Sequence, residues 1–438
     1  MAANSQPVVI VGGGFSGSML AARLAEAGVA STLIDRSGLF GRGVAYSTTF
    51  DGHLLNVRAN RMSAVEGQPN DFVDWLAVHA PDRADPDGFA PRRLYGAYLE
   101  DRLARVDAAH PGRITRIAGE AAAIEEAGVR LADGRMIAGA RAVLATGNPA
   151  PSTARRLSGE RIVSDPWRPG ALDRIGETDH VLILGTGLTM VDVLLELTAG
   201  GWRGVASTLS RRGLTPRAHG DRPDAPVPPT EALLHAAPSQ RLREARRLSD
   251  QAGWRGVMEG LRPVTAALWR ETDPTTRARL LRHLRPWWDV HRHRIAGTAA
   301  DQLDALRRAG RWTVAAGAVL AIEPTAQAVS LAYRPRGGVG RETLTASWLI
   351  DCTGPTQDPA RDALTAPLLA SGRGRLEALG AGLDLDAQGR ILAADGAPDS
   401  CLLALGPPAR AAFWETTAVP DIRKRIEAMV KTLTEPPA

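Results

Sequence analysis

The stretch VVIVGGGFSGSMLAARL, Val8 to Leu24, decides the fold of this 438-residue chain. Its first four residues are apolar and β-branched, as expected of a strand buried on both faces of a parallel sheet. In the turn that follows, Gly12 permits a tight bend, Gly14 lets the backbone approach a pyrophosphate, and Gly17 lets helix and strand touch. The helical spacing after the turn places a helix N-terminus at the phosphates. We therefore predict a dinucleotide-binding βαβ unit.

The next strand, STLID, completes this first site. It ends in Asp35, eighteen residues beyond Gly17, where an acidic group hydrogen-bonds a ribose hydroxyl. A purely structural glycine turn is the alternative, and the order of strand, turn, helix, strand and acid favours binding. The residues expected to bind the first dinucleotide are Gly12, Gly14, Phe15, Ser16, Gly17, Asp35 and Arg36.

A second stretch, HVLILGTGLTMVDVLLEL, His180 to Leu197, repeats the pattern, with Met190 in place of the third glycine. Its next strand ends in Ser210-Arg211-Arg212 instead of an acid, and two guanidinium groups suit the 2′-phosphate of NADP. A solvated basic turn is the alternative. We predict FAD at the first site and NADPH at the second. The residues expected to bind the second dinucleotide are Gly185, Gly187, Leu188, Thr189, Arg211 and Arg212.

Two further apolar strands break at Thr-Gly turns, RAVLATGNPAP over 141–151 and ASWLIDCTGPTQD over 346–358. In two-dinucleotide flavoproteins such turns mark where the chain leaves the FAD domain and re-enters it, so we add Thr146, Gly147, Thr353 and Gly354 to the cofactor-binding residues. The predicted fold is α/β, with two Rossmann-like domains arranged as in flavoprotein pyridine-nucleotide oxidoreductases and the NADPH domain inserted in the FAD domain. The expected boundaries are 1–172 and 345–438 for the FAD domain, 173–344 for the NADPH domain, and about 232–309 for a helical excursion.

The overall charge and hydropathy exclude several classes of protein. The net charge of +5 comes from 53 Lys and Arg against 48 Asp and Glu, and only Lys424 and Lys431 are lysines. These charges are scattered and interleaved without a nucleic-acid motif, so we expect no nucleic-acid partner. No apolar run is long enough to cross a bilayer, and the N-terminal residues do not resemble a signal peptide. We expect a cytoplasmic protein without membrane attachment.

The cysteines and the standard catalytic motifs exclude further chemistry. Cys352 and Cys401 lie 49 residues apart and no C-x-x-C is present, so we expect neither a redox dithiol nor a zinc ribbon but two buried small hydrophobes. His291 and His293 diverge on a helix and would not share a metal. No G-x-S-x-G, H-E-x-x-H or P-loop lysine supports a hydrolase or an NTPase.

Several strings carry a family resemblance, namely GRGVAYST, HLLNVRANRMS, RRLYGAYL, ILGTGLTMVDVLLEL, SRRGL, LRHLRPWWDVHRHR, DCTGP and WETTAVPDIR. Over nearly its whole length the chain resembles a bacterial family of FAD/NAD(P)-binding proteins and, more distantly, class B flavin monooxygenases. The latter often carry F-x-G-x-x-x-H-x-x-x-W before the second Rossmann strand. Here Leu157, Gly159, Val163 and Trp167 occupy that register, and the missing His argues against Baeyer–Villiger chemistry.

The resemblance also implies which residues lie beside the flavin. The segment 41–63 is expected to pass the isoalloxazine, although Met62 could equally fill the core and Asn56 could form a turn. Gly406 stands where related flavoproteins hold the ribityl chain, but Pro407 replaces their Asp. A helix beginning near Pro420 would aim its N-terminus at the flavin N1/O2 edge. The flavin-adjacent candidates are Arg42, Tyr46, Asn56, Met62, Trp414 and Thr416.

The expected function is that of an FAD-containing, NADPH-dependent monooxygenase. NADPH would reduce FAD, O₂ would form a flavin C4a-hydroperoxide, and one oxygen would pass to carbon, nitrogen or sulfur of a small substrate. The basic cluster over 282–294 would either face the cleft, recognising an anionic substrate or the nucleotide, or form a solvated helix. Two alternatives stay open: an NADPH-dependent flavin dehydrogenase or electron donor, and a non-catalytic FAD-binding sensor.

Overall fold

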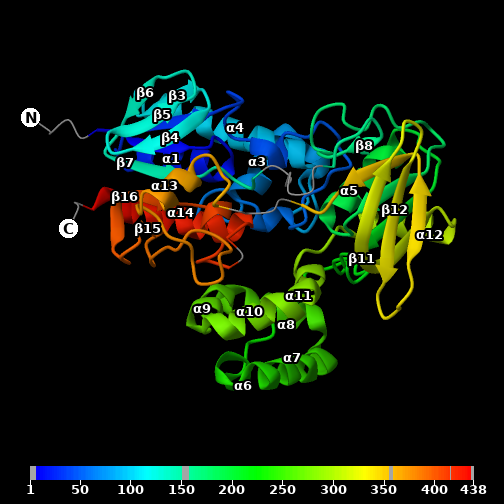
Figure 1. Ribbon diagram of the computed structural model, residues 1–438. Helices are drawn as coiled ribbons and strands as arrows, with labels where there is room; N and C mark the ends of the chain where they lie inside the picture. Colours follow the sequence, from blue (N-terminus) through cyan, green and yellow to red (C-terminus); the bar gives the residue numbers. More distant parts are fainter. Residues whose placement is uncertain (1–5, 150–156, 355–358, 415, 436–438) are drawn as a thin grey trace, which may run out of the picture.

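Two β-sheets, each containing one of the glycine-rich stretches, organise the structure (Figure 1). The computed structural model describes residues 6–149, 157–354, 359–414 and 416–435. The first sheet has the strand order β15-β16-β7-β1-β2-β3. Its strands are β1 (Val8–Val11), β2 (Ser31–Asp35), β3 (Ile114–Ala118), β7 (Arg141–Leu144), β15 (Arg390–Leu392) and β16 (Pro398–Ala404). All neighbours pair in parallel except β15 with β16, which places β1 at the centre of a buried parallel sheet.

Helices cover one face of this first sheet. They are α1 (Phe15–Glu26), α4 (Arg92–Ala109) and α14 (Val419–Thr434), with the shorter α3 (Asp71–His79) beside α4. Their apolar sides meet in one core that includes Ile10, Met19, Tyr95 and Met429, all nearly inaccessible to solvent. The other face is covered by α13 (Thr365–Ala370) and a small antiparallel sheet of β4 (Ala121–Glu125), β5 (Gly128–Leu131) and β6 (Met136–Ala138).

The second sheet has the order β13-β12-β11-β10-β9-β14-β8. Its parallel part consists of β8 (Ile162–Val163), β14 (Trp348–Asp351), β9 (Val181–Leu184), β10 (Ala206–Ser210) and the first half of β11 (Trp312–Pro324). An antiparallel extension adds β12 (Val329–Pro335) and β13 (Glu342–Ala346). Helices α5 (Leu188–Ala199) and α12 (Gly297–Arg308) share its core. The predicted fold of two Rossmann-like domains is confirmed.

Strand pairing corrects the predicted domain boundaries at two points. Strand β14 pairs with β9 and β8 pairs with β14, so both belong to the second sheet. The chain therefore enters the second sheet before residue 172 and leaves it only after Asp351. The local pattern of a buried strand followed by Thr-Gly is the same in both sheets, and only the long-range pairing distinguishes them.

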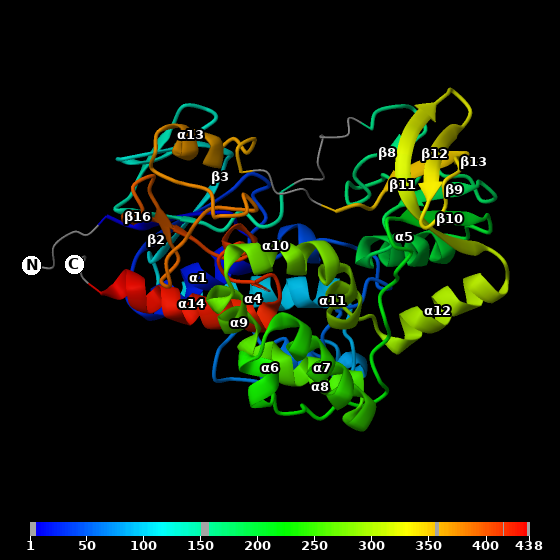
Figure 2. The same cartoon turned by 60° about the horizontal axis from the view of Figure 1, so that its bottom comes forward.

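The helical excursion lies between the two domains and below them in Figure 1. It comprises α6 (Glu231–His235), α7 (Pro238–Ala252), α8 (Trp254–Leu261), α9 (Thr265–Glu271), α10 (Pro274–His283) and α11 (Arg285–Arg292). Figure 2 brings these helices forward, and Trp269 Nε1 of α9 donates to Ala411 O, 3.0 Å away, in the first domain. The excursion is shorter than expected because α12 packs on the second sheet beside α5.

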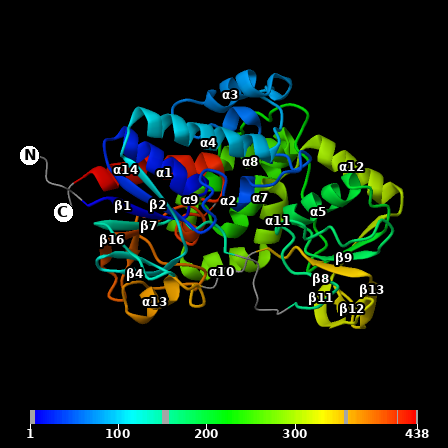
Figure 3. The same ribbon diagram turned by 90° about the horizontal axis from the view of Figure 1, so that it is seen from above.

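Seen from above, the first sheet with α1, α4 and α14 occupies one end of the molecule, and the second sheet with α5 and α12 the other (Figure 3). Short helical turns α2 (Gly43–Tyr46), η1 (Ala59–Arg61), η2 (Pro81–Arg83), η3 (Arg262–Val264) and η4 (Pro407–Ala409) complete the order. Among the described residues no helix has the length and apolarity that a membrane span needs. The expectation of two buried thiols is wrong for one of them, since Cys352 is buried but Cys401 is exposed.

Candidate functional site

The first glycine turn requires glycine for backbone reasons. Gly12 has a φ of +112°, and a Cβ added there would lie 2.3 Å from Ala145 O. A Cβ on Gly17 would lie 1.9 Å from Gly12 O, so helix α1 can touch β1 only because this residue has no side chain. Gly14, the residue preceding α1, provides no side-chain cap, which leaves N-terminal amides of the helix for an anion. The residues fit a bound pyrophosphate.

Asp35 is held against this turn. Its Oδ2 accepts from Gly13 N at 2.7 Å, while Oδ1 accepts from Ser37 N at 2.8 Å and from Ser37 Oγ at 2.6 Å. Each carboxylate oxygen can accept more than one hydrogen bond. The acid is therefore fixed beside the turn and can also receive a ribose hydroxyl, while Arg36 is exposed.

The flavin candidates differ in what they already contact. Arg42 forms a two-point ion pair with Glu100, at 2.6 and 2.7 Å. Tyr46 packs edge-on against another tyrosine, and burial raises its pKa to about 12. Met62 is buried in the core of the first domain. Trp414 stacks on Trp269 with ring centroids 4.5 Å apart. These side chains already have protein partners.

Thr416 is different from those candidates. It is 2% exposed, and its Oγ1 has no hydrogen-bond partner within the described parts of the chain. A buried hydroxyl without a partner is costly, so the position fits a polar ligand atom. Gly406 lies against the first glycine turn, because a Cβ added there would be 2.5 Å from Ser16 Oγ of helix α1.

The second glycine turn is built in the same way. Gly185 has a φ of +98°, and an added Cβ would lie 2.3 Å from Cys352 O. Gly187 is exposed, and its Cβ would meet no atom within 4 Å, so the space before α5 is open. Leu188 and Thr189 begin α5, and Met190 is fully buried in the second core. An open turn at a helix N-terminus fits a second dinucleotide.

Each of the two Thr-Gly turns lies against one of the glycine turns. Ala145, which precedes Thr146 and Gly147, contacts Gly12, and Cys352 contacts Gly185. Thr353 donates from both N and Oγ1 to Asp351 Oδ1, at 2.9 and 2.6 Å, which fixes the second of these turns. Gly147 and Gly354 have φ values of +75° and +78°. Thr353 and Gly354 therefore lie at the second site, since they follow β14 of the second sheet.

The two arginines predicted to bind the 2′-phosphate have different surroundings. Arg211 is exposed at the end of β10. Arg212 donates to the carbonyl oxygens of Arg282, at 2.9 Å, and His283, at 3.3 Å, at the end of α10. Arg212 thus ties the second sheet to the helical excursion as well as flanking the predicted nucleotide site.

A buried ion pair joins the two domains. Arg92 of α4 contacts Asp192 of α5, with Nη1 and Oδ2 2.9 Å apart and side-chain exposures of only 15% and 8%. His53 is buried beside them and its Nε2 lies 3.2 Å from Asp192 O. A cavity of about 20 Å³ opens here between α5, α12 and the segment around Asn56. Arg92, Asp192 and His53 were not predicted as site residues, because they are far apart in the sequence and only the fold brings them together.

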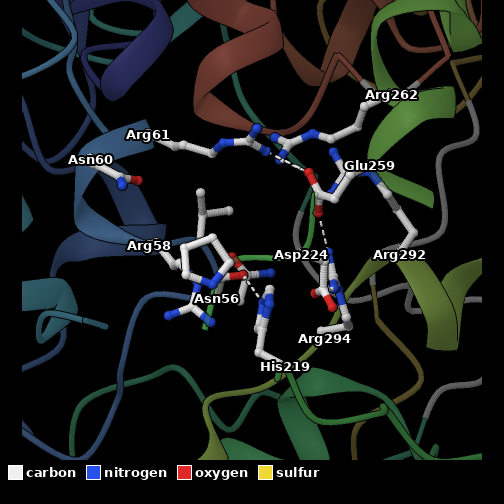
Figure 4. A pocket seen from close by; sticks show the side chains of 12 residues that line it. Asn56, Arg58, Asn60, Arg61, His219, Asp224, Glu259, Arg262, Arg292 and Arg294 are labelled. Carbon is white, nitrogen blue, oxygen red and sulfur yellow. Dashed lines mark hydrogen bonds and ion pairs between the residues drawn. The ribbon is translucent and has the colours of Figure 1, made fainter. Parts of the chain in front are cut away.

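A second, larger cavity of about 80 Å³ lies where the first domain, the second domain and the helical excursion meet (Figure 4). Asn56 lines both cavities. The polar residues around the larger one are Asn56, Arg58, Asn60, Arg61, His219, Asp224, Glu259, Arg262, Arg292 and Arg294. Of the predicted basic cluster, only Arg292 and Arg294 reach it.

Glu259 is the centre of this arginine cavity. It is 9% exposed and accepts hydrogen bonds from Arg61 and Arg294, while Arg262 Nη1 lies 3.7 Å from its Oε2. Burial opposes ionisation, but the three guanidinium groups outweigh it and keep the pKa of Glu259 below its usual range. Burial, helped by the charge of Arg294, lowers the pKa of His219 to about 4, so this histidine is neutral and its Nε2 donates to Asn56 O at 3.0 Å.

A family model matches the part of the chain that contains the first glycine turn. Residues 9–149 match the family described as FAD-NAD(P)-binding. The predicted resemblance is confirmed over this segment, which carries the first glycine turn, Asp35 and the segment around Asn56. No curated protein matches the chain.

Solved structures are similar over the whole chain, at low sequence identity. The ornithine N-hydroxylase of Kutzneria sp. 744, with reduced FAD, NADP⁺ and L-ornithine, is 16% identical, covers 98% of this chain and 99% of its own, and has a TM-score of 0.67. The L-lysine 6-monooxygenase of Pseudomonas syringae is 17% identical, the match covers 98% of this chain and 99% of that one, and the TM-score is 0.64. The cadaverine monooxygenase of Erwinia amylovora is 12% identical, the match covers 99% of this chain and 95% of that one, and the TM-score is 0.66. The chain shares the fold of these proteins.

Among the described residues, no group of three or more His, Cys, Asp or Glu side chains could hold a metal ion.

Proposed function

We propose that this chain binds FAD at the first glycine turn and NADPH at the second, and that it is a monooxygenase of a small substrate. The observation that carries the proposal is the pair of turns, each packed so closely that Gly12, Gly17 and Gly185 admit no side chain, and each opening a helix. The whole-chain similarity to an ornithine N-hydroxylase, an L-lysine 6-monooxygenase and a cadaverine monooxygenase supports the same assignment.

The residues of the first site would divide the work of holding FAD. The amides at the start of α1 would bind the pyrophosphate, and Asp35 would accept a ribose hydroxyl. The Thr416 hydroxyl, which has no hydrogen-bond partner among the described residues, would meet the flavin, with Asn56 on the side of the second domain. Bound FAD would supply the electron-accepting and oxygen-activating chemistry that no side chain offers.

The residues of the second site would hold NADPH beside it. The open turn at Gly187 lets a pyrophosphate approach the first amides of α5, and exposed Arg211 suits the 2′-phosphate. NADPH would provide two electrons; one atom of O₂ would enter the substrate at carbon, nitrogen or sulfur, and the other would leave as water.

Reoxidation in air tests the oxygenase assignment. Purified protein carrying FAD, once reduced by NADPH, should react with O₂ through a transient spectrum distinct from those of oxidised and fully reduced flavin. Rapid reduction of an artificial acceptor together with slow oxygen consumption would instead identify an electron donor. A bound flavin that neither NADPH nor NADH reduces would identify a sensor. Either of these results would overturn the proposal.

A further inference from the structure

The ion pair between Arg92 and Asp192 holds helix α5 of the second domain against the first domain. Arg92 Nη1 lies 2.9 Å from Asp192 Oδ2, and Arg92 Nη2 donates to Asp192 Oδ1 at 3.1 Å, so the guanidinium group meets the carboxylate at two points. The Nε of the same guanidinium group donates to Leu54 O at 3.0 Å. A planar fork with three hydrogen-bonding contacts leaves little freedom to rotate or slide.

His53 of the first domain makes a second contact with the same residue of α5. Its side chain is buried, its Nδ1 lies 2.7 Å from Thr48 Oγ1, and its Nε2 lies 3.2 Å from Asp192 O. The ring of Trp167 packs against this group, with its centroid 5.8 Å from that of His53 and 5.8 Å from Arg92 Cζ. Both the backbone and the side chain of Asp192 are therefore tied to the first domain.

The place of this junction along α5 relates it to the second dinucleotide site. Asp192 is the fifth residue of α5, which begins at Leu188. It thus lies about one helical turn from the amides that the proposed function assigns to the NADPH pyrophosphate. Because a helical turn is held by its own backbone hydrogen bonds, a displacement of Asp192 moves those amides with it. The junction therefore sets where the second dinucleotide site lies relative to the first domain.

We propose that Arg92 and Asp192 are positioning residues for flavin reduction, because their ion pair places the two dinucleotide sites at the separation that hydride transfer requires. The inference rests on the proposed function, in which NADPH gives one hydride, two electrons with one proton, to FAD and leaves as NADP⁺. A misplacement of about 1 Å can slow such a step about 100-fold. A buried ion pair is a weak source of stability, and its best-attested use is to fix one arrangement.

A paired apolar replacement separates positioning from stability. In the double variant Arg92→Met/Asp192→Leu both buried charges are removed together, which leaves the free energy of unfolding close to that of the parent. The directional contacts are lost with the charges. We therefore expect urea unfolding close to that of the parent, whereas the limiting rate of anaerobic flavin reduction by NADPH should fall at least about tenfold.

Two single variants accompany the double variant. Arg92→Lys keeps the charge but loses the planar fork, so its reduction rate should lie between those of the parent and the double variant. Arg93→Met is the matched control, since Arg93 is the next residue of α4 and its ion pair with Asp51 is exposed. Its reduction rate should equal that of the parent. The NADPH dissociation constant should stay within about threefold of the parent in each variant, because the proposed nucleotide contacts lie within the second domain.

The arrangement of the domains can be measured without flavin reduction. Cys401 is exposed on β16 of the first domain, Cys352 is buried, and Val339 is exposed between β12 and β13 of the second domain. Spin labels on Cys401 and on the substitution Val339→Cys report the distance between the domains by electron paramagnetic resonance of the FAD-loaded protein. We expect one narrow distance distribution with the ion pair intact, and a broader or shifted one with Arg92→Met/Asp192→Leu.

The reduction rate and the label distance decide the inference. A double variant with the reduction rate of the parent, or with the same narrow distance distribution, would overturn it. If the double variant does not fold, Arg92→Lys decides by the same two readouts. Variants that match a parent readily reduced by NADPH would overturn this inference alone. A parent whose bound flavin NADPH leaves oxidised would overturn the proposed function and this inference with it.

Discussion

The substitution Gly187→Ala isolates the second nucleotide site from the fold. Gly187 has φ −87° and ψ −163°, a conformation that alanine adopts readily, and the added Cβ would meet no protein atom within 4 Å. At this N-cap position alanine is less favourable than glycine by roughly 0.5–1 kcal/mol, and the more restricted unfolded chain of the alanine variant offsets about 0.4–1 kcal/mol. The free energy of unfolding should therefore change by less than about 0.5 kcal/mol.

The expected loss appears in NADPH affinity. If a pyrophosphate lies against this turn, the new methyl group pushes it away from the first amides of α5. Losing one hydrogen bond to a charged group costs about 1.5–3 kcal/mol, which weakens binding by about 10- to 150-fold.

Three measurements on the same preparation check this expectation: NADPH dissociation constant, FAD content and urea unfolding. Gly297→Ala is the matched control, because Gly297 begins α12 and its Cβ would also meet nothing. We expect normal FAD content and stability in both variants and weakened NADPH binding only in Gly187→Ala. An NADPH affinity within twofold of the parent would refute the placement of the nucleotide.

Three further outcomes follow from buried groups. Arg92→Met should lower the free energy of unfolding by about 3–5 kcal/mol, because it leaves the Asp192 carboxylate of α5 buried and unpaired. Arg93→Met breaks only the exposed ion pair with Asp51, so in urea unfolding it should lower the free energy by less than about 1 kcal/mol. Burial is the main cause that lowers the pKa of His219 to about 4. In acid the unfolded chain therefore binds a proton that the folded chain does not, and the free energy of unfolding should fall by up to about 3 kcal/mol as the pH drops from about 6.5 toward 4. The variant His219→Gln should lose that part of the acid sensitivity, measured as the free energy of unfolding at pH 7 and pH 4.5. Burial raises the pKa of the Cys352 thiol far above its usual range, whereas Cys401 is exposed. A thiol reagent at pH 8 should therefore label one cysteine in the native protein and two in urea. Labelling of two cysteines in the native protein would contradict the packing around Cys352.

The sequence predicted the parts of the site whose chemistry is local. Gly12, Gly17 and Gly185 could be recognised because a tight turn and a close contact between helix and strand require glycine at a fixed spacing. The α/β fold followed from the same spacing. Asp35 was recognised from its distance along the chain, and its carboxylate accepts a hydrogen bond from Gly13 N in the turn.

The parts that depend on distant contacts could not be predicted. The assignment of β14 to the first domain failed because a buried strand and a Thr-Gly turn look alike in both sheets, and only pairing with β9 decides between them. The arginine cavity is assembled from three separated segments. The basic run that includes Arg292 and Arg294 was recognised in the sequence as a candidate binding cluster. Glu259 lies in the short amphipathic helix α8 and Arg262 directly follows it, so in the sequence both resemble surface charges.

Anaerobic addition of NADPH to the purified protein tests the central claim most directly, because that claim requires two dinucleotides in contact within one chain. The protein should be yellow, with one FAD per chain, and stoichiometric NADPH should bleach the flavin absorbance while NADH does so less efficiently. A colourless protein that cannot take up added FAD, or a bound flavin that NADPH leaves oxidised, would contradict the account.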